Sequence, residues 1–244
     1  MPPAPQKIHS VGDSPLTTEP PDHPAEEIIK HFAEREAEFK KERDNYTYTQ
    51  TVSMETINDD SNTPDGEYRV VSDIIFTPEG KLFEHVTFAP PNTLQRIQLT
   101  QQDVDDVQNV QPFVLTTTEL PKYDVTYVGR QDVDELSCYV FDVAPKVLEK
   151  KQRYFKGRVW VERKDLQIVL TDGKAVPDLK NNLFPRFKTY RENIAGGFWF
   201  PTYTKADDYL HFSGGDIHIR MAVRYSNYKR YGSTVKIGTA TEVK

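Results

Sequence analysis

Hydrophobic and polar residues alternate along most of the chain beyond residue 45, with the period of two that is typical of β-strands. The stretch 154–173, YFKGRVWVERKDLQIVLTDG, shows this pattern most clearly. Val159 and Val161 share one face of its first half, whereas mostly polar side chains point the other way. Trp160 and Val169 add apolar area to this second face, so the pattern leaves open which face is the interior. We predict a β-hairpin with one apolar and one largely polar face.

The register of this hairpin follows from the turn that joins its arms. A two-residue turn at Lys164-Asp165 would place Val161 opposite Ile168 and Val159 opposite Leu170. The apolar faces of the two arms would then coincide, as a correct register requires. These four residues are therefore predicted to form one wall of an apolar interior.

Similar alternation predicts about ten strands in all, joined mostly as hairpins. Turn signals include Gly196-Gly197 and Gly214-Gly215, which suit tight connections. No strand–helix–strand pattern of a cofactor-binding fold interrupts the series. The pattern favours an antiparallel sheet in meander order. The other strand segments are 46–57, 68–76, 81–88, 123–131, 137–145, 185–194, 198–206, 209–212 and 217–231.

Two segments have a helical period instead. Residues 24–43 carry acidic residues near the start and basic residues near the end, as suits the helix dipole, and Pro24 suits the first helical position. A narrow apolar stripe on this helix has to pack against another element, and a sheet follows at once. Residues 100–111 predict a short second helix with Thr100 as its cap. The stripe consists of Ile28, Phe32 and Phe39, with Ile29 beside them.

The two ends of the chain differ in composition from the middle. Residues 1–22 hold six prolines and no aromatic residue, which predicts a flexible Pro-rich tail. We assign residues 23–232 to a single domain and residues 233–244 to a C-terminal tail. No run is long and apolar enough for a membrane span, and no signal peptide is recognisable. The chain is therefore interpreted as cytosolic or as the mature form of an exported protein.

Charge and cysteine usage narrow the possible partners. The formal net charge is −6, with Lys and Arg scattered among acidic residues, whereas a nucleic-acid partner usually needs a concentrated basic patch. Cys138 is the single cysteine and lies in a strand pattern, LSCYVFDV. It cannot form an internal disulfide, so we predict a buried free thiol, with a reactive thiol as the alternative.

The histidines and acid pairs are the first candidates for chemistry. His211 and His218 flank the Gly214-Gly215 turn symmetrically and would stand opposite each other, close enough to share a metal ion. Asp207 and Asp216 are possible additional ligands, although two histidines alone are not a site. The paired acids, including Asp207-Asp208, are placed in loops or on polar helical faces. We predict no metal site and keep a solvent-facing polar pair as the simpler interpretation.

An aromatic segment at 198–203 is apolar on both faces. Phe198 and Phe200 point one way, while Trp199 and Tyr203 point the other. Core packing explains this pattern, and so does a sheet that offers one face to an apolar ligand. Pro201 cannot donate a ladder hydrogen bond, which places this strand at an edge or at a bulge.

The order of these elements and two local motifs resemble a known family. Over roughly residues 24–232 the chain resembles bacterial outer-membrane lipoprotein-sorting proteins of the LolA/LolB-like superfamily, as a divergent member. The resemblance implies an α+β fold in which an incomplete antiparallel barrel of about ten strands wraps around the N-terminal helix and the short inserted helix. It also implies a periplasmic location, with the signal peptide removed. The motifs are the G-x-V-W-V core (Gly157, Val159, Trp160, Val161) and a W-x-P element (Trp199, Pro201).

The function that this resemblance implies is a non-enzymatic carrier that holds a lipid or lipoprotein acyl chain in an apolar cavity between sheet and helices. Its partners would be a lipid or an acylated protein, with a membrane-anchored protein as a further candidate. No catalytic residue and no cofactor is predicted. A protein-interaction module of the periplasmic stress-sensor kind is one alternative, and a metal-assisted hydrolase using His211 and His218 is another. The expected interior residues are Phe32, Phe39, Val159, Val161, Ile168 and Leu170.

Overall fold

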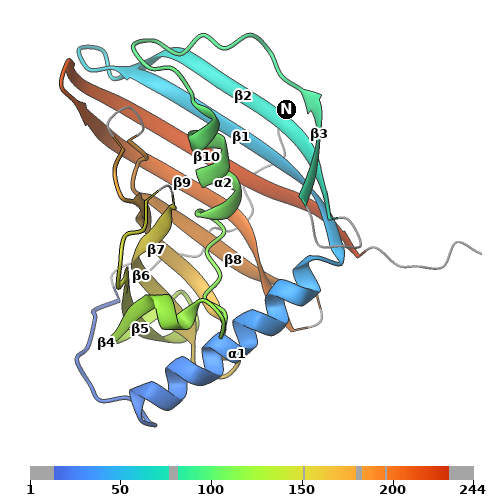
Figure 1. Ribbon diagram of the computed structural model, residues 1–244, viewed down its shortest axis with the longest axis vertical. Helices are drawn as coiled ribbons and strands as arrows, with labels where there is room; N and C mark the ends of the chain where they lie inside the picture. Colours follow the sequence, from blue (N-terminus) through green and yellow to red (C-terminus); the bar gives the residue numbers. More distant parts are fainter. Residues whose placement is uncertain (1–13, 77–81, 151, 180–182, 196, 231–244) are drawn as a thin grey trace, which may run out of the picture.

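In the computed structural model of the protein, the described residues are 14–76, 82–150, 152–179, 183–195 and 197–230. They form a ten-stranded antiparallel sheet with two α-helices (Figure 1), which confirms the predicted fold class. The helices are α1 (Ala25–Arg43) and α2 (Gln101–Asn109), and Leu120–Lys122 forms a short 3-10 turn. The strands are β1 (Tyr46–Asn58), β2 (Thr63–Phe76), β3 (Leu82–Phe88), β4 (Tyr123–Val133), β5 (Leu136–Pro145), β6 (Tyr154–Glu162), β7 (Ile168–Val176), β8 (Phe187–Ala195), β9 (Phe198–Phe212) and β10 (Gly215–Arg230).

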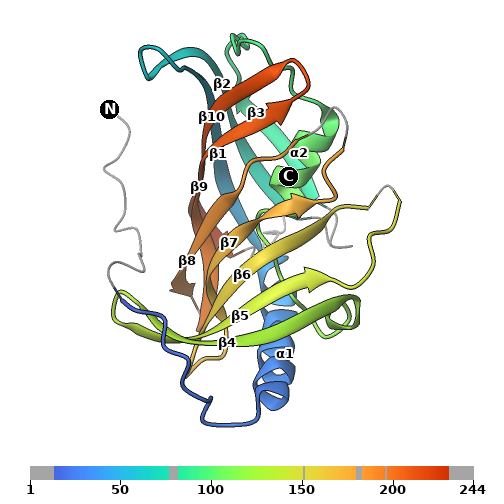
Figure 2. The same cartoon turned by 90° about the vertical axis from the view of Figure 1, so that its left-hand side faces the viewer.

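The strand order β3-β2-β1-β10-β9-β8-β7-β6-β5-β4 leaves the sheet open. Strands β4 to β10 follow one another as a meander, and β1 joins the sheet by pairing with β10. The edge strands β3 and β4 do not meet, so the barrel is incomplete, as predicted. The chain passes from one edge to the other through α2, on the side of the sheet that also carries α1 (Figures 1 and 2). We call this side the concave side and the opposite side the convex side.

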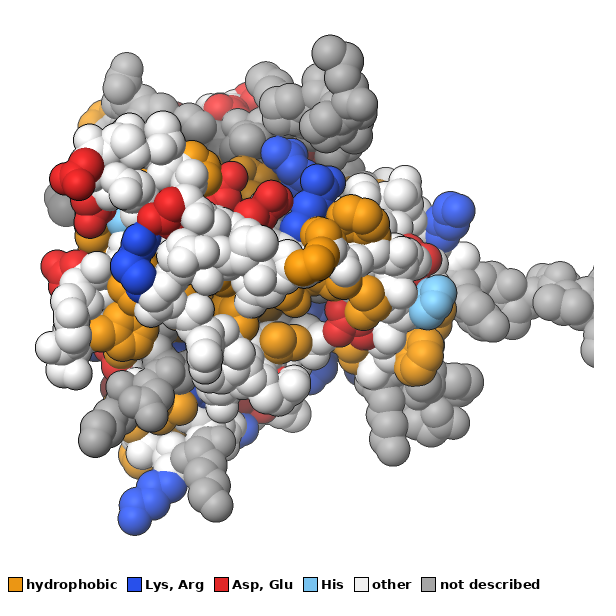
Figure 3. Space-filling model, turned by 90° about the horizontal axis from the view of Figure 1, so that it is seen from above, with side chains coloured by type: hydrophobic (Ala, Val, Ile, Leu, Met, Phe, Trp, Pro, Cys, Tyr) orange, Lys and Arg blue, Asp and Glu red, His pale blue; other side chains and the backbone are white. Residues whose placement is uncertain are grey.

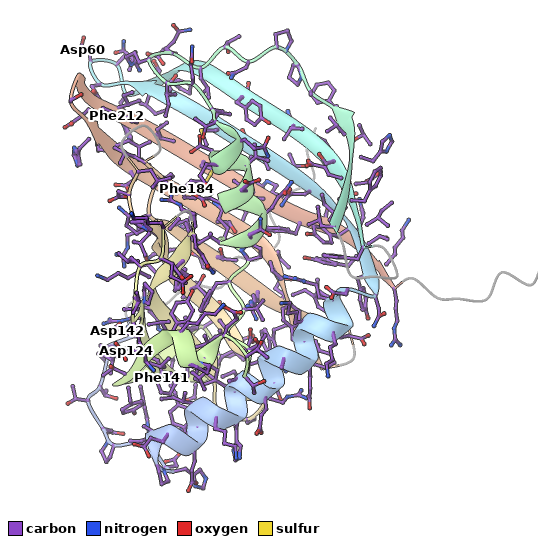
Figure 4. The ribbon with its side chains drawn as sticks, viewed as in Figure 1. Asp60, Asp124, Phe141, Asp142, Phe184 and Phe212 are labelled. Atoms are coloured by element: carbon purple, nitrogen blue, oxygen red, sulfur yellow. The ribbon has the colours of Figure 1, made fainter. Side chains whose placement is uncertain are left out.

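Apolar side chains are buried on both sides of the sheet. The largest cluster lies on the concave side and joins both helices to most of the strands. Figure 4 shows Phe141 of this cluster near α1 and Phe184 nearer α2. A smaller cluster on the convex side contains Trp160, Val169 and Trp199, so the expectation of a largely polar second face is wrong here.

Helix α1 packs against the sheet through the predicted stripe. Ile28, Phe32 and Phe39 are buried, and the Phe32 ring lies 5.4 Å from the Phe141 ring between centroids. Pro24 stands just before the helix rather than in its first turn. The stripe also includes one charged residue, Glu36, which is completely buried.

Helix α2 begins as the sequence predicts. The Thr100 side chain accepts a hydrogen bond from the Asp103 backbone N–H, and the Asp103 carboxylate accepts one from the Thr100 backbone N–H. This capping box satisfies two donors that the first turn of a helix leaves unpaired. Among the described residues, neither helix combines the length and the hydrophobicity that a membrane crossing requires.

The hairpin at 154–173 forms, but its register is only partly as predicted. Val161 lies opposite Ile168 as expected, whereas Val159 lies opposite Thr171. The register shifts next to Trp160, which pairs with Leu170, so Val169 is an extra residue in β7. Such a bulge moves every later side chain to the other face. Leu170 therefore belongs to the convex cluster, and its placement in the concave wall is wrong.

Two further details of the sheet differ from the sequence prediction, and the placement of Pro201 agrees with the second of its two predicted alternatives, a bulge. Strand β9 continues through Asp207-Asp208, which the pattern placed in a loop. The turn before β10 is Ser213-Gly214, because Gly215 already pairs with Phe212. Pro201 lies in the central strand β9 and not at an edge of the sheet. It sits beside a register shift between β8 and β9, and the pairing of β9 with β10 begins only at Tyr203. A bulge thus accommodates the missing backbone donor.

Part of the segment expected to be a tail is packed against edge strand β4. Thr17 forms an antiparallel bridge with Arg130, with N–O distances of 2.9 and 2.8 Å. Asp22 forms ion pairs with Arg130 and Arg163 and accepts a hydrogen bond from Tyr139. We call residues 14–22 the strap, because they run along β4 and cover part of that edge.

Candidate binding site: the concave face and its cover

The concave cluster contains most of the residues that the sequence assigns to the interior. Phe32, Val159, Val161 and Ile168 all belong to it and are completely buried. The structure therefore brings these four residues of α1, β6 and β7 together. Phe39 is also buried but lies in an adjoining small cluster with Tyr46 and Phe200. The Phe39 and Phe200 rings meet edge to face, 5.3 Å apart.

This interior is filled by protein side chains. The five residues that lie on the concave side are each 0% exposed, and none of them lines the cleft described below. An acyl chain would therefore have to displace part of the cover formed by α1, α2 and the segment that follows α2. The attachments of that cover to the sheet decide how easily it moves.

Helix α1 is attached by a buried ion pair that sequence reasoning did not identify. The Arg191 guanidinium of β8 donates to both Glu36 carboxylate oxygens, at 2.9 and 3.1 Å, and the two side chains are 1% and 0% exposed. Glu36 also accepts a hydrogen bond from the Ile168 backbone N–H at 3.2 Å. Arg191 further donates to the Phe113 carbonyl and lies over the Phe39 ring. One side-chain pair thus connects α1, β7, β8 and the segment after α2.

A second buried ion pair attaches α2. Arg153, just before β6, donates to both carboxylate oxygens of Asp106 on α2, and the shortest of these distances is 2.7 Å. Burial raises the pKa of the Asp106 carboxyl group, and Arg153 opposes that shift. Gln108 of α2 donates to Glu84 of β3 at 2.8 Å. The cover is therefore held by a few polar contacts in addition to its apolar packing.

A cleft of about 390 Å³ opens between the end of α1, the segment after α2 and the neighbouring strands. Its lining includes Phe113, Tyr123 and Phe155, which belong to the concave cluster. Phe113 stacks on Phe155 with ring centroids 4.3 Å apart. Burial raises the pKa of the Tyr123 hydroxyl to about 12. The cleft thus leads from solvent to the edge of the apolar interior.

The rim of this cleft is charged. Lys40 and Arg43 of α1 lie on it together with Asp44 and Glu119. Arg43 lies over the Phe76 ring at 5.5 Å, and its Nε is buried without a hydrogen-bond partner among the described residues. At the upper end of the molecule, in contrast, apolar side chains lie in small areas between charged and polar ones (Figure 3).

The histidine pair considered for a metal does not form. Because the turn is at Ser213-Gly214, His211 lies opposite Asp216, and His218 lies opposite Tyr209. His211 pairs with Asp216 at 2.8 Å, and His218 shares a hydrogen bond of 2.5 Å with Asp207. Within the described residues no group of three or more His, Cys, Asp or Glu side chains could hold a metal ion.

The single cysteine is placed as the simpler interpretation predicted. Cys138 is free and completely buried in the convex cluster. Burial, with smaller contributions from Glu162 and Asp132, raises the pKa of its thiol to about 12. Because the thiolate is the reactive form, the raised pKa and the complete burial of this side chain both disfavour its reaction in the folded protein.

An open antiparallel half-barrel with helices on its concave side defines the structural class of this protein. No family model matches the chain, and no curated protein matches it. Among solved structures, a DUF1329 family protein from Desulfovibrio piger is 15% identical, with a TM-score of 0.41, over 88% of this chain and 94% of that chain. The structure of MucB in complex with MucA(peri) is 10% identical, with a TM-score of 0.23, over 79% and 93%.

A Pseudomonas aeruginosa MucA/MucB complex is 12% identical, with a TM-score of 0.23, and the match covers 82% of this chain and 99% of that chain. Identities and TM-scores this low say nothing about function.

Proposed function

We propose that this protein is a non-enzymatic periplasmic binding or carrier module that holds one acyl chain of a lipid or lipoprotein between its sheet and its helices. The observation that carries the proposal is the continuous apolar layer on the concave side of an unclosed sheet, roofed by two helices and irregular chain. The sequence resemblance to lipoprotein-sorting proteins supports the same function and the periplasmic location.

The cleft beside the end of α1 is the proposed entrance. It reaches Phe113 and Phe155, so a chain that enters there meets aromatic side chains of the concave cluster first. Its volume of about 390 Å³ lies within the range of roughly 300–1,000 Å³ common for ligand pockets. Movement of α2 away from the sheet would extend the cleft into the interior.

The energetics allow such an opening. Each methylene taken out of water contributes about 0.8 kcal/mol, so a dozen methylenes contribute about 10 kcal/mol. Separating a buried ion pair such as Asp106–Arg153 costs about 3–5 kcal/mol when one charge is left without its partner. The burial of a long chain therefore outweighs the loss of one attachment of the cover. A short chain of a few methylenes would not.

Displacement of a fluorescent dye tests the proposal. The environment-sensitive dye N-phenyl-1-naphthylamine should bind the purified protein, and palmitate should displace it at a stoichiometry near one. Octanoate, whose six methylenes contribute about 5 kcal/mol and leave little surplus over the opening cost of about 3–5 kcal/mol, should displace it much more weakly. Absence of dye binding, or equal displacement by octanoate and palmitate, would contradict the proposed mode of binding.

Two valine-to-lysine variants locate the binding site. Val114 lines the cleft, whereas Val147 is 67% exposed and lies outside it. Val114→Lys should weaken palmitate binding at least tenfold, because the ammonium group has to be desolvated where the chain enters. Val147→Lys should bind palmitate like the unmodified protein. Equal effects of both substitutions would exclude the cleft as the entrance.

A further inference from the structure

The two edges of the sheet differ in how far other segments of the chain cover them. The strap lies on β4 and pairs with it at Thr17 and Arg130. On the other side, the part of β2 that extends beyond β3 is covered at Glu67, whose backbone groups bond to Thr93. Strand β3 lies at the edge, and among the described residues none outside β2 forms a backbone hydrogen bond with residues 82–88.

Strand β3 also exposes large apolar side chains. Phe83, Val86 and Phe88 are 56%, 49% and 53% exposed. Phe83 pairs with Ile75 and Phe88 pairs with Val71, so both phenylalanines stand on the convex side.

Val86 pairs with the buried Ser72 and stands on the concave side. A bulge in β3 between Val86 and Phe88 keeps Phe83 and Phe88 on the same face, although they are five positions apart.

Proteins usually blunt such an edge with lysine, proline or a covering segment, because its free N–H and C=O groups can pair with another strand. None of residues 82–88 is lysine or proline. The only carboxylate in the strand, Glu84, is occupied with Ser72 and Gln108 on the concave side. Apart from the bulge at Thr87, strand β3 therefore has the features of a binding edge without lysine, proline or a covering segment among the described residues.

We propose that the β3 edge docks an extended peptide segment of a partner protein, which adds to the sheet as an eleventh strand. Backbone hydrogen bonds would supply affinity, and alternate side chains would supply specificity. The chain itself shows this mode of binding on a small scale, since the strap docks on β4 through one bridge and side-chain contacts. A short extended segment is thus a suitable occupant of this sheet's edges.

The surroundings define the chemistry of the segment. Apolar side chains at alternate positions would contact Phe83 and Phe88 on the convex side. Asp73 of β2 lies opposite His85 of β3 on the same side. The Arg69 guanidinium lies over the Phe88 ring, 5.9 Å from its centroid. Asp73 is one strand inward from the edge and accepts a hydrogen bond from Thr49, so His85 is the polar side chain that a docked segment would meet between the two phenylalanines. A span of five to seven residues would cover β3.

A synthetic probe peptide tests the proposal. The probe is a fluorescein-labelled nonapeptide in which valine alternates with threonine and lysine, and fluorescence anisotropy measures its binding. We expect saturable binding that weakens at least tenfold in Phe83→Lys. The matched variant Tyr209→Lys, at a side chain 44% exposed on the central strand β9, should bind like the unmodified protein. Hydrogen exchange of the β3 amides should slow when the peptide is bound.

Three outcomes would overturn the proposal. The first is absence of saturable binding. The second is equal binding of a peptide of the same composition with its valines at helical spacing. The third is a concentration-dependent dimer that Phe83→Lys abolishes, which would assign the edge to a second copy of this chain. Phe83 does not line the palmitate entrance, although its neighbour Leu82 does, and its side chain points to the convex side. Phe83→Lys should therefore leave palmitate binding unchanged, so failure here is distinguishable from failure of the proposed function.

Discussion

Removal of the Glu36 carboxylate tests how α1 is held on the sheet. In Glu36→Ala the Arg191 guanidinium, 1% exposed, would keep its charge without its partner. The Ile168 backbone N–H would also lose its acceptor. Breaking a buried pair by removing one member costs about 3–5 kcal/mol. The folded-to-unfolded ratio should therefore fall by roughly two to three and a half powers of ten.

Urea denaturation followed by tryptophan fluorescence measures this loss. The midpoint should fall while the slope stays constant, because the surface exposed on unfolding hardly changes. The melting temperature should fall by roughly 6–20 °C for a chain of this size. Urea is preferable to a guanidinium salt here, since added ions would screen the charges under study.

A second glutamate on the same helix provides the control. Glu38 pairs with Arg35 in an exposed i,i+3 pair, so Glu38→Ala should cost at most about 1 kcal/mol. The double variant Glu36→Ala/Arg191→Ala should lose less than the sum of the two single variants, because the unpaired charge is gone. A loss in Glu36→Ala no larger than that in Glu38→Ala would refute the view that this pair attaches α1.

Three further predictions concern other parts of the protein. Cys138, with its thiol pKa at about 12, should not react with a thiol reagent at neutral pH until the protein is unfolded in urea. Thr100→Ala should lower the unfolding free energy by about 1 kcal/mol in urea denaturation, because it removes the capping box of α2. Hydrogen bonds from Arg163 first, then Tyr139, lower the pKa of Asp22 from 3.8 to about 2. The stabilisation from ionised Asp22 is thus present above about pH 4 and is lost as the pH falls through 2. An NMR titration of the Asp22 carboxyl carbon should show a midpoint near pH 2, and Arg163→Gln should raise that midpoint.

The sheet could be predicted from the sequence because its signals are local. Alternation with a period of two marks nearly every strand, and the apolar stripe of α1 follows from helical spacing. The capping box of α2 is likewise contained in four adjacent residues, from Thr100 to Asp103. These features need no knowledge of which segments meet in space.

The errors arose where one extra residue changes a register. The bulge at Val169 moves Leu170 to the convex side, although the sequence around it alternates normally. A shift of the turn by one residue, to Ser213-Gly214, likewise separates His211 from His218. No residue type marks the bulge at Val169, and several turns suit the glycine-rich stretch at Gly214-Gly215.

The sequence indicated at most one partner of each ion pair that attaches the cover to the sheet. Glu36 lies four residues after Phe32 and three before Phe39, so a charged side chain within the apolar stripe was visible. Its partner Arg191 is 155 positions away, and only the fold brings the two together. The same holds for Asp106 and Arg153, which are separated by 47 positions.

Native mass spectrometry of the protein mixed with palmitate tests the central claim most directly. We expect one palmitate adduct per chain, retained in the gas phase by the unmodified protein and by Val147→Lys, and largely absent in Val114→Lys. A spectrum that shows only the bare chain at palmitate concentrations well above stoichiometry, or several adducts that the Val114→Lys substitution leaves unchanged, would contradict the assignment of the concave interior as an acyl-binding site.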